Sequence, residues 1–150
     1  GMKAIVLAVL AGVFWGVGEV FTKSVLHTGR VGPITAVAVR TAVALPVLAI
    51  AYAVVVHGLK AEPADWTKAG APTLTKLVVG SGVIAGALAL LCFYGALNFG
   101  EIGRIKPIAF GLAPAVAVVL GWLVLGEAMT VKKVVGVVLV VGGVLVLTGK

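Results

Sequence analysis

Apolar residues fill five long stretches of the 150-residue chain, and short polar segments separate them. Each stretch is long enough to cross ~30 Å of hydrocarbon as a helix of about 18 or more residues. We predict helices at about residues 4–26, 34–56, 77–97, 105–125 and 131–148. Glycine and proline mark the first turn, HTGRVGP, and the longest polar segment is HGLKAEPADWTKAGAPTLTK. The pattern predicts an all-α integral membrane protein with one domain over residues 1–150.

Composition supports a lipid bilayer as the main partner of the chain. Hydrophobic residues make up 61% of the sequence, charged residues make up 11%, and the mean hydropathy is +1.23. A soluble domain of this length is about a quarter charged. The net charge of +7 comes from basic residues scattered over loops and helix ends, with no basic run. This scatter is typical of interfacial anchors, and we expect no nucleic-acid partner.

The charges of the loops leave the orientation in the membrane open. Five spans place the termini on opposite faces, with six Lys or Arg residues on the amino-terminal face and five on the other. An excess of these residues normally fixes orientation, and six against five gives almost none. Either one or two individual charges decide the topology, or the chain inserts both ways up.

Two charges fall inside the spans at matching depths. Glu19 lies four residues beyond the centre of the first span, about 6 Å, and Arg40 lies five residues before the centre of the second, about 7.5 Å. The two helices are joined on the Arg40 side, so both charges lie at nearly the same level. Each alone costs about 2.5–3.5 kcal/mol at a helix centre, and together they can pair.

Three interpretations of Glu19 remain open. It forms a structural salt bridge with Arg40; or it is a protonatable carboxylate in a water-accessible cavity, exchanging a proton for a cationic or polar substrate; or the first helix is misplaced. Lys23 follows Glu19 by four residues, in the favourable acid-before-base order, and is near enough to the helix end to reach the interface. Trp15, one turn before Glu19, either packs or walls a cavity and contacts a cation with its ring.

The later spans contain features of packing and bending. Pro114, in GLAPAV, removes a backbone donor near the middle of the fourth span, where it would kink or loosen the helix and form a hinge. Gly136 and Gly143 lie seven residues apart on one face of the last span. Small residues let membrane helices approach closely, so this face is either a dimer seam or a packing surface within one chain.

No signature of an enzyme, a metal site or a cofactor site is present. His27 and His57 fall at loop ends without ligand spacing, and the single cysteine, Cys92, lies in an apolar run. The glycines do not form a phosphate-binding loop between a strand and a helix. A cleaved signal peptide fits the first apolar run poorly, because no small-residue cleavage site follows it.

The order of several motifs resembles the EamA-type domain of the drug/metabolite transporter superfamily. These motifs are WGVGEVFTK, with Trp15, Gly16 and Lys23; Arg40 early in the second span; CFYGALNFGE; and RIKPIAFGLAPAVAVVLGWLVLGEAMT, with ten residues between Pro114 and LGE. A glycine-bearing last span, KKVVGVVLVVGGVLVLTG, completes the likeness, which covers nearly the whole chain.

The resemblance implies a five-helix half of an inverted-repeat transporter. Such a half can be completed by a second, antiparallel chain, with the substrate site at the midplane between them. The small multidrug resistance proteins of the same superfamily are similar: they form antiparallel dimers, with a membrane glutamate in the first helix and glycines seven apart on the last. Glu19 and the pair Gly136 and Gly143 look like these features.

We therefore expect a secondary transporter in the cytoplasmic (inner) membrane, working as an antiparallel homodimer on a small polar metabolite or organic cation. Glu19 would be the proton or cation site, Arg40 its partner, Trp15 a cavity wall and Pro114 a hinge. The rival is a non-transporting membrane subunit in which Glu19 and Arg40 only tie two helices together. A third possibility is that the chain is half of a longer protein.

Overall fold

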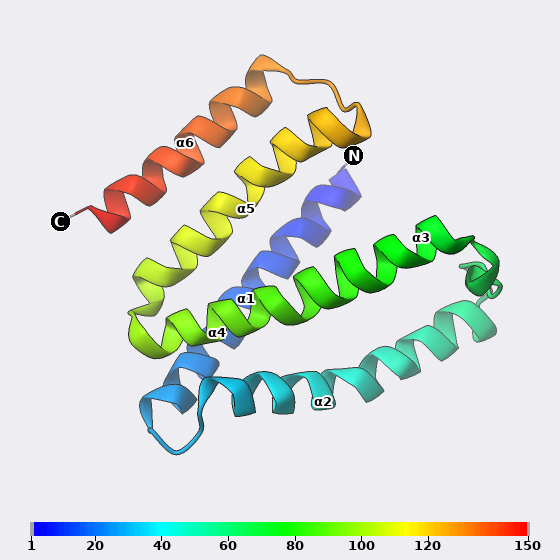
Figure 1. Cartoon of the computed structure of the whole chain (residues 1–150), viewed down its shortest axis with the longest axis horizontal. Helices are drawn as coiled ribbons and strands as arrows, with labels where there is room; N and C mark the ends of the chain where they lie inside the picture. Colours follow the sequence, from blue (N-terminus) through cyan, green and yellow to red (C-terminus); the bar gives the residue numbers. More distant parts are fainter. Residues whose placement is uncertain (1, 150) are drawn as a thin grey trace. The chain divides into compact units, whose positions relative to one another are not determined.

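The structure is a computed structural model and describes residues 2–149. It is all-helical in its described regular elements, and five of its helical segments are long and apolar enough to span a membrane (Figure 1). These spans are Met2–His27, Pro33–Gly58, Ala71–Phe99, Ile102–Leu125 and Val131–Thr148. The expected fold class, five transmembrane helices, is confirmed.

Local sequence explains where the helices of the first three spans begin and end. Helix α1 (Met2–His27) is followed by Gly29, which has a φ of 67° that favours glycine. Helix α2 (Pro33–Tyr52) starts with its proline in the first turn, where a missing N–H costs nothing, and continues as the wider π-helix η1 (Ala53–Gly58). A short 3-10 turn, η2 (Trp66–Lys68), follows in the polar segment.

The third span is longer than the apolar pattern predicts. It starts with α3 (Ala71–Thr75) rather than near residue 77, because Gly70 turns the chain and Pro72 lies in the first turn of the helix. It continues through the π-helix η3 (Lys76–Leu88) and α4 (Ala89–Phe99). Pro72, Thr73 and Thr75 lower the hydropathy of this stretch, but they belong to the helix and not to the loop before it.

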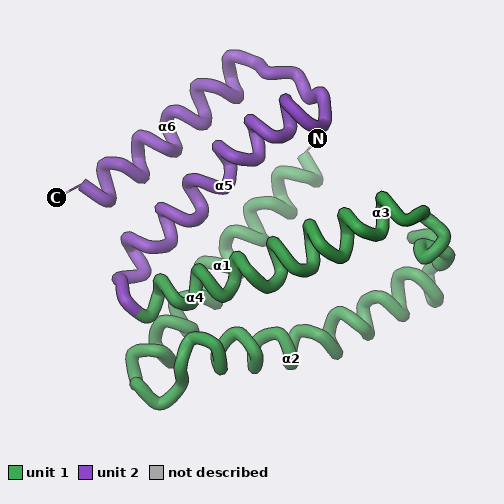
Figure 2. Tube along the Cα trace, viewed as in Figure 1, with its two compact units in different colours: residues 1–98 green, residues 99–150 purple. Residues whose placement is uncertain are grey.

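The chain divides into two compact units after Asn98 (Figure 2). The first contains α1, α2, α3 and α4 as far as Asn98, and its buried side chains include Leu26, Val37, Val56 and Leu97. Most apolar side chains of the spans are exposed: at most 11% of the most apolar 18-residue window of any span is buried. Such faces are suited to contact with lipid or with other membrane helices.

The second unit is a helical hairpin of α5 (Ile102–Leu125) and α6 (Val131–Thr148). Helix α5 stays helical through Pro114 and ends where Gly126 adopts a left-handed conformation, with φ 67°. Thr130 then caps α6 by accepting a hydrogen bond from the backbone N–H of Lys133 at 3.3 Å. At the far end, the Arg104 guanidinium donates to the Thr148 carbonyl at 3.2 Å, tying the start of α5 to the end of α6.

Helices α5 and α6 pack tightly at Gly111, which is buried in α5. A Cβ atom built there would overlap the Val144 side chain and lie 3.7 Å from Val140 Cγ1. Val144 has little freedom to move aside, because a β-branched residue in a helix has one strongly preferred rotamer. Only glycine therefore fits at position 111 without a shift of the two helices.

We expect Gly111→Ala to destabilise the protein by about 1–3 kcal/mol, the usual cost of overpacking. The measurement is unfolding of purified protein in detergent, followed by circular dichroism. Gly103→Ala is the matched control on the same helix, because no heavy atom lies within 4 Å of the Cβ it would add. A Gly111→Ala protein that unfolds like Gly103→Ala would contradict the tight packing.

Candidate functional site

Glu19, in α1, is the charged residue that the described chain buries most, with 3% of its surface exposed. Its Oε1 atom accepts a hydrogen bond from Arg40 Nη1, in α2, at 3.2 Å. The Arg40 side chain is one-third exposed. The two charges that sequence places at matching depths are thus an ion pair between two helices.

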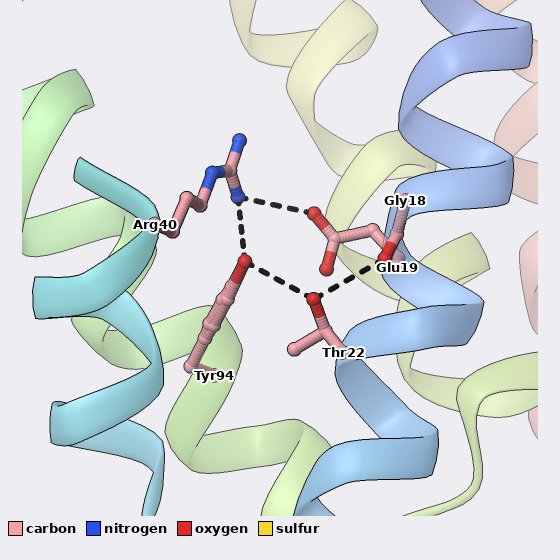
Figure 3. A network of polar contacts seen from close by, with 5 residues as sticks. All are labelled: Gly18, Glu19, Thr22, Arg40 and Tyr94. Carbon is pink, nitrogen blue, oxygen red and sulfur yellow. Dashed lines mark hydrogen bonds and ion pairs between the residues drawn. The ribbon is translucent and has the colours of Figure 1, made fainter. Parts of the chain in front are cut away.

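Tyr94, in α4, joins the third span to this pair (Figure 3). Its hydroxyl accepts a second hydrogen bond from Arg40 Nη1, at 2.8 Å, and lies 3.3 Å from Thr22 Oγ1. Thr22 Oγ1 in turn donates to the Gly18 carbonyl at 3.2 Å. Since this bond uses the one proton of Thr22, Tyr94 is the donor in the bond between the hydroxyls, and the donors run in one direction from Arg40 to Gly18.

The second carboxylate oxygen of Glu19 has a different environment. Glu19 Oε2 is buried and has no hydrogen-bond partner within residues 2–149. A buried polar atom normally has a partner, and an unpaired one costs about 1–3 kcal/mol, more when it is charged. Glu19 therefore has one oxygen fixed by Arg40 and one oxygen available to a proton, a cation or a hydrogen-bond donor.

The ion pair borders a cavity of about 270 Å³ inside the first unit. Its lining combines the polar network with aromatic walls: Phe14, Trp15, Gly18, Glu19, Thr22, Ala36, Arg40 and Tyr94. Pockets for drug-sized ligands measure about 300–1,000 Å³, so this cavity suits a smaller molecule. Trp15, which sequence predicts as a wall, lines it.

The comparison with known families is decisive for the class of protein. The profile of the EamA-like transporter family matches residues 2–149. The chain belongs to the EamA-like transporter family. No curated protein and no solved structure matches it at a significant level. Family membership makes the chain a membrane transporter rather than an enzyme, and its five spans correspond to one EamA half unit.

Lys23 lies one turn beyond Glu19 in this EamA-like chain and contacts a different part of α4. Its ammonium donates to the Leu97 carbonyl at 2.6 Å, in the last turn of that helix. Carbonyls in a last turn lack helical partners and carry partial negative charge, so a lysine there is stabilising. The structure thus brings Lys23 to a helix end, where it ties α1 to α4.

The remaining predicted residues lie in the second unit. Pro114 is near the middle of α5, and Gly136 and Gly143 lie on α6 with no heavy atom within 4 Å of a Cβ built on either. Among the described residues, no three His, Cys, Asp or Glu side chains gather as a metal site requires. The hinge and the dimer seam stay predictions.

Tyr94 and Thr22 are the site residues that sequence reasoning missed. Tyr94 lies within the motif CFYGALNFGE, and a hydroxyl inside a span needs a hydrogen-bond partner. Thr22 lies three residues after Glu19, on the same helix face. A search for every polar side chain inside the spans would have selected both, without identifying their partners.

We expect Tyr94→Phe to destabilise the protein by about 1–2 kcal/mol, because it removes a hydrogen bond to a charged group within the membrane. Unfolding in detergent measures this loss. Tyr52→Phe is the control, since it also removes one accepting hydroxyl, in the exposed bond from Trp66 Nε1 at 3.0 Å. Equal stability of Tyr94→Phe and wild type would show that the network contributes nothing.

Proposed function

We propose that this EamA-like chain is a secondary transporter that exchanges protons for a small polar metabolite or organic cation by alternating access. The observation that carries the proposal is the unpartnered, buried Oε2 of Glu19 beside a cavity that also contains Arg40 and Trp15. A carboxylate oxygen in such a place accepts either a proton or a cationic group.

A proton and a substrate cation cannot occupy Glu19 Oε2 at the same time, and this competition would couple proton movement to substrate transport. A proton on Oε2 neutralises the carboxylate, and a substrate ammonium needs the same oxygen as a charged acceptor. Each therefore displaces the other, which is the requirement for exchange. Trp15 is half exposed and lines the cavity, so its ring face is suited to contact a bound cation.

Arg40 and Tyr94 would keep the site organised while Glu19 changes charge. Arg40 Nη1 donates to both Glu19 Oε1 and the Tyr94 hydroxyl. A proton on Oε2 removes the negative charge of Glu19 but leaves Oε1 an acceptor, so the guanidinium keeps both hydrogen bonds. These bonds limit the cost of an unpaired charge within the membrane. Lys23, bonded to Leu97, would support the same helix contact from one turn away.

Alternating access requires a second half, and we propose an antiparallel homodimer with a seam at Gly136 and Gly143. Two observations support this: the loop charges are nearly balanced, and both glycines are open to close approach. Pro114 is the proposed hinge, because it lacks the N–H that would tie the middle of α5 to the preceding turn. The proposed location is the cytoplasmic (inner) membrane.

The transport proposal predicts the behaviour of Glu19→Gln. Glutamine keeps an oxygen acceptor for Arg40 but cannot exchange a proton at neutral pH. In liposomes under a proton gradient, we expect wild type to show substrate-evoked proton movement across a panel of amines, amino acids and sugars. Glu19→Gln should fall to the level of empty liposomes, and Glu19→Asp should keep part of the activity.

The rival function, a non-transporting subunit, predicts a different result. If Glu19 only ties α1 to α2, Glu19→Gln should lower the melting temperature and leave any stabilisation by ligand unchanged. If Glu19 is the site, the folded variant should lose that stabilisation. Equal transport by Glu19→Gln and wild type would refute the proposed role of Glu19.

The seam predicts that Gly136→Leu with Gly143→Leu dissociates the dimer. Bulk at both positions should cost about 1–3 kcal/mol of helix contact, a loss of about ten- to a hundredfold in affinity. Light scattering of the detergent-solubilised protein measures the number of chains in each particle. Gly142→Leu is the control on the same helix. No heavy atom lies within 4 Å of a Cβ built at Gly142, and this position is rotated by about 100° about the helix axis from Gly143. Dissociation by the control alone would refute the seam.

A further inference from the structure

A second cavity, of about 610 Å³, lies in the first unit beside the polar segment between the second and third spans. Its apolar lining includes Val56 at the end of η1 and Leu77 at the start of η3. A volume of this size accommodates a drug-sized molecule. Because the polar segment joins two membrane spans, the cavity lies where hydrocarbon gives way to headgroups and water.

A hydrogen bond between two aromatic side chains fixes one wall of this cavity. Trp66 Nε1, in the turn η2, donates to the Tyr52 hydroxyl at the end of α2 at 3.0 Å. Both side chains line the cavity. Tryptophan and tyrosine are enriched at membrane interfaces, where one part of the ring contacts apolar groups and the other is hydrated. The turn is thus pinned over the end of the span instead of extending into water.

The cavity rim carries both signs of charge. Glu62, Asp65 and Lys68 all line it, and their side chains form no ion pair or hydrogen bond with any residue between 2 and 149. An unpaired acid and base at one rim normally neutralise each other when they are close enough. No ion pair forms among these three residues, so two carboxylates and one ammonium are available to a ligand that carries both charges.

We propose that this cavity binds a bilayer phospholipid with an ethanolamine headgroup. The primary ammonium of the headgroup has three N–H donors for the carboxylates of Glu62 and Asp65, and its phosphate pairs with Lys68. The glycerol backbone and the upper acyl chains contact the apolar lining. Charge thus favours a zwitterion, and hydrogen bonding favours a primary amine over a choline, which has no N–H donor.

An anionic phospholipid with a glycerol headgroup fits this rim less well. Its phosphate would also reach Lys68, but its headgroup would meet two carboxylates without a positive charge, and like charges at such a distance repel. The inference does not depend on the proposed transport function, because none of these residues lines the cavity beside Glu19.

The test measures the binding of dioleoyl phosphatidylethanolamine, -choline and -glycerol to the full chain in detergent. Native mass spectrometry counts the lipids retained by each chain, and thermal unfolding at matched lipid fractions gives the relative affinities. We expect the ethanolamine lipid to be retained and to raise the melting temperature more than the other two. Lys68→Gln, or Glu62→Gln with Asp65→Asn, should weaken its binding by about tenfold, the value of one hydrogen bond to a charged group.

Matched controls distinguish lipid binding in this cavity from a general effect of surface charge. Lys132→Gln and Glu101→Gln change the same charges at exposed positions outside the cavity and should leave the lipid preference unchanged. Lys68→Arg and Glu62→Asp keep the charges and should retain binding, which covers the case in which a neutralised variant fails to fold. Equal effects of the three lipids would overturn the proposal. So would stronger stabilisation by soluble phosphoethanolamine than by the lipid, which would indicate a site for a free zwitterion.

Discussion

The ion pair between Glu19 and Arg40 is the interaction on which the packing of the first unit depends. In a bilayer, an apolar helix face contacts lipid tails as favourably as it contacts another helix, so apolar contact alone contributes little free energy to helix association. Polar bonds between spans then decide which helices meet. Arg40 Nη1 bonds to α1 through Glu19 and to α4 through Tyr94, so one nitrogen of α2 links three spans. Lys23 adds a second link between α1 and α4 at Leu97.

The same network treats the two oxygens of the Glu19 carboxylate differently. A pair that served only to join helices would be expected to satisfy both oxygens of the carboxylate, since an unpaired buried acceptor is costly. Here Oε1 is bonded and Oε2 is not, and the residue lies against a cavity. Oε1 stabilises the contact between α1 and α2, while Oε2 has no hydrogen-bond partner within residues 2–149. A site of this kind is consistent with transport, in which occupancy of one group must alternate.

Close packing of two helices at a glycine, rather than a buried ion pair, stabilises the second unit. Gly111 lets α5 and α6 approach closely at Val144, and the bonds at the two ends of the hairpin lie at exposed groups. The ion pair of Lys133 with Glu127, at 2.9 Å, is well exposed to solvent and contributes little to stability. On α6 itself, no heavy atom lies within 4 Å of a Cβ built at Gly136, Gly142 or Gly143.

Sequence alone determined the number of spans, the membrane class, the family resemblance and the matching depths of Glu19 and Arg40. These follow from the length of apolar runs and from the rise per residue, which are properties of single helices. Tertiary structure decided the partners. Thr22 and Tyr94 are 72 residues apart, and their contact depends on how each helix is rotated about its axis. These spans are apolar on all sides, so no amphipathic stripe reveals that rotation. The link from Lys23 to Leu97 and the two cavities described above therefore became apparent only in the folded chain.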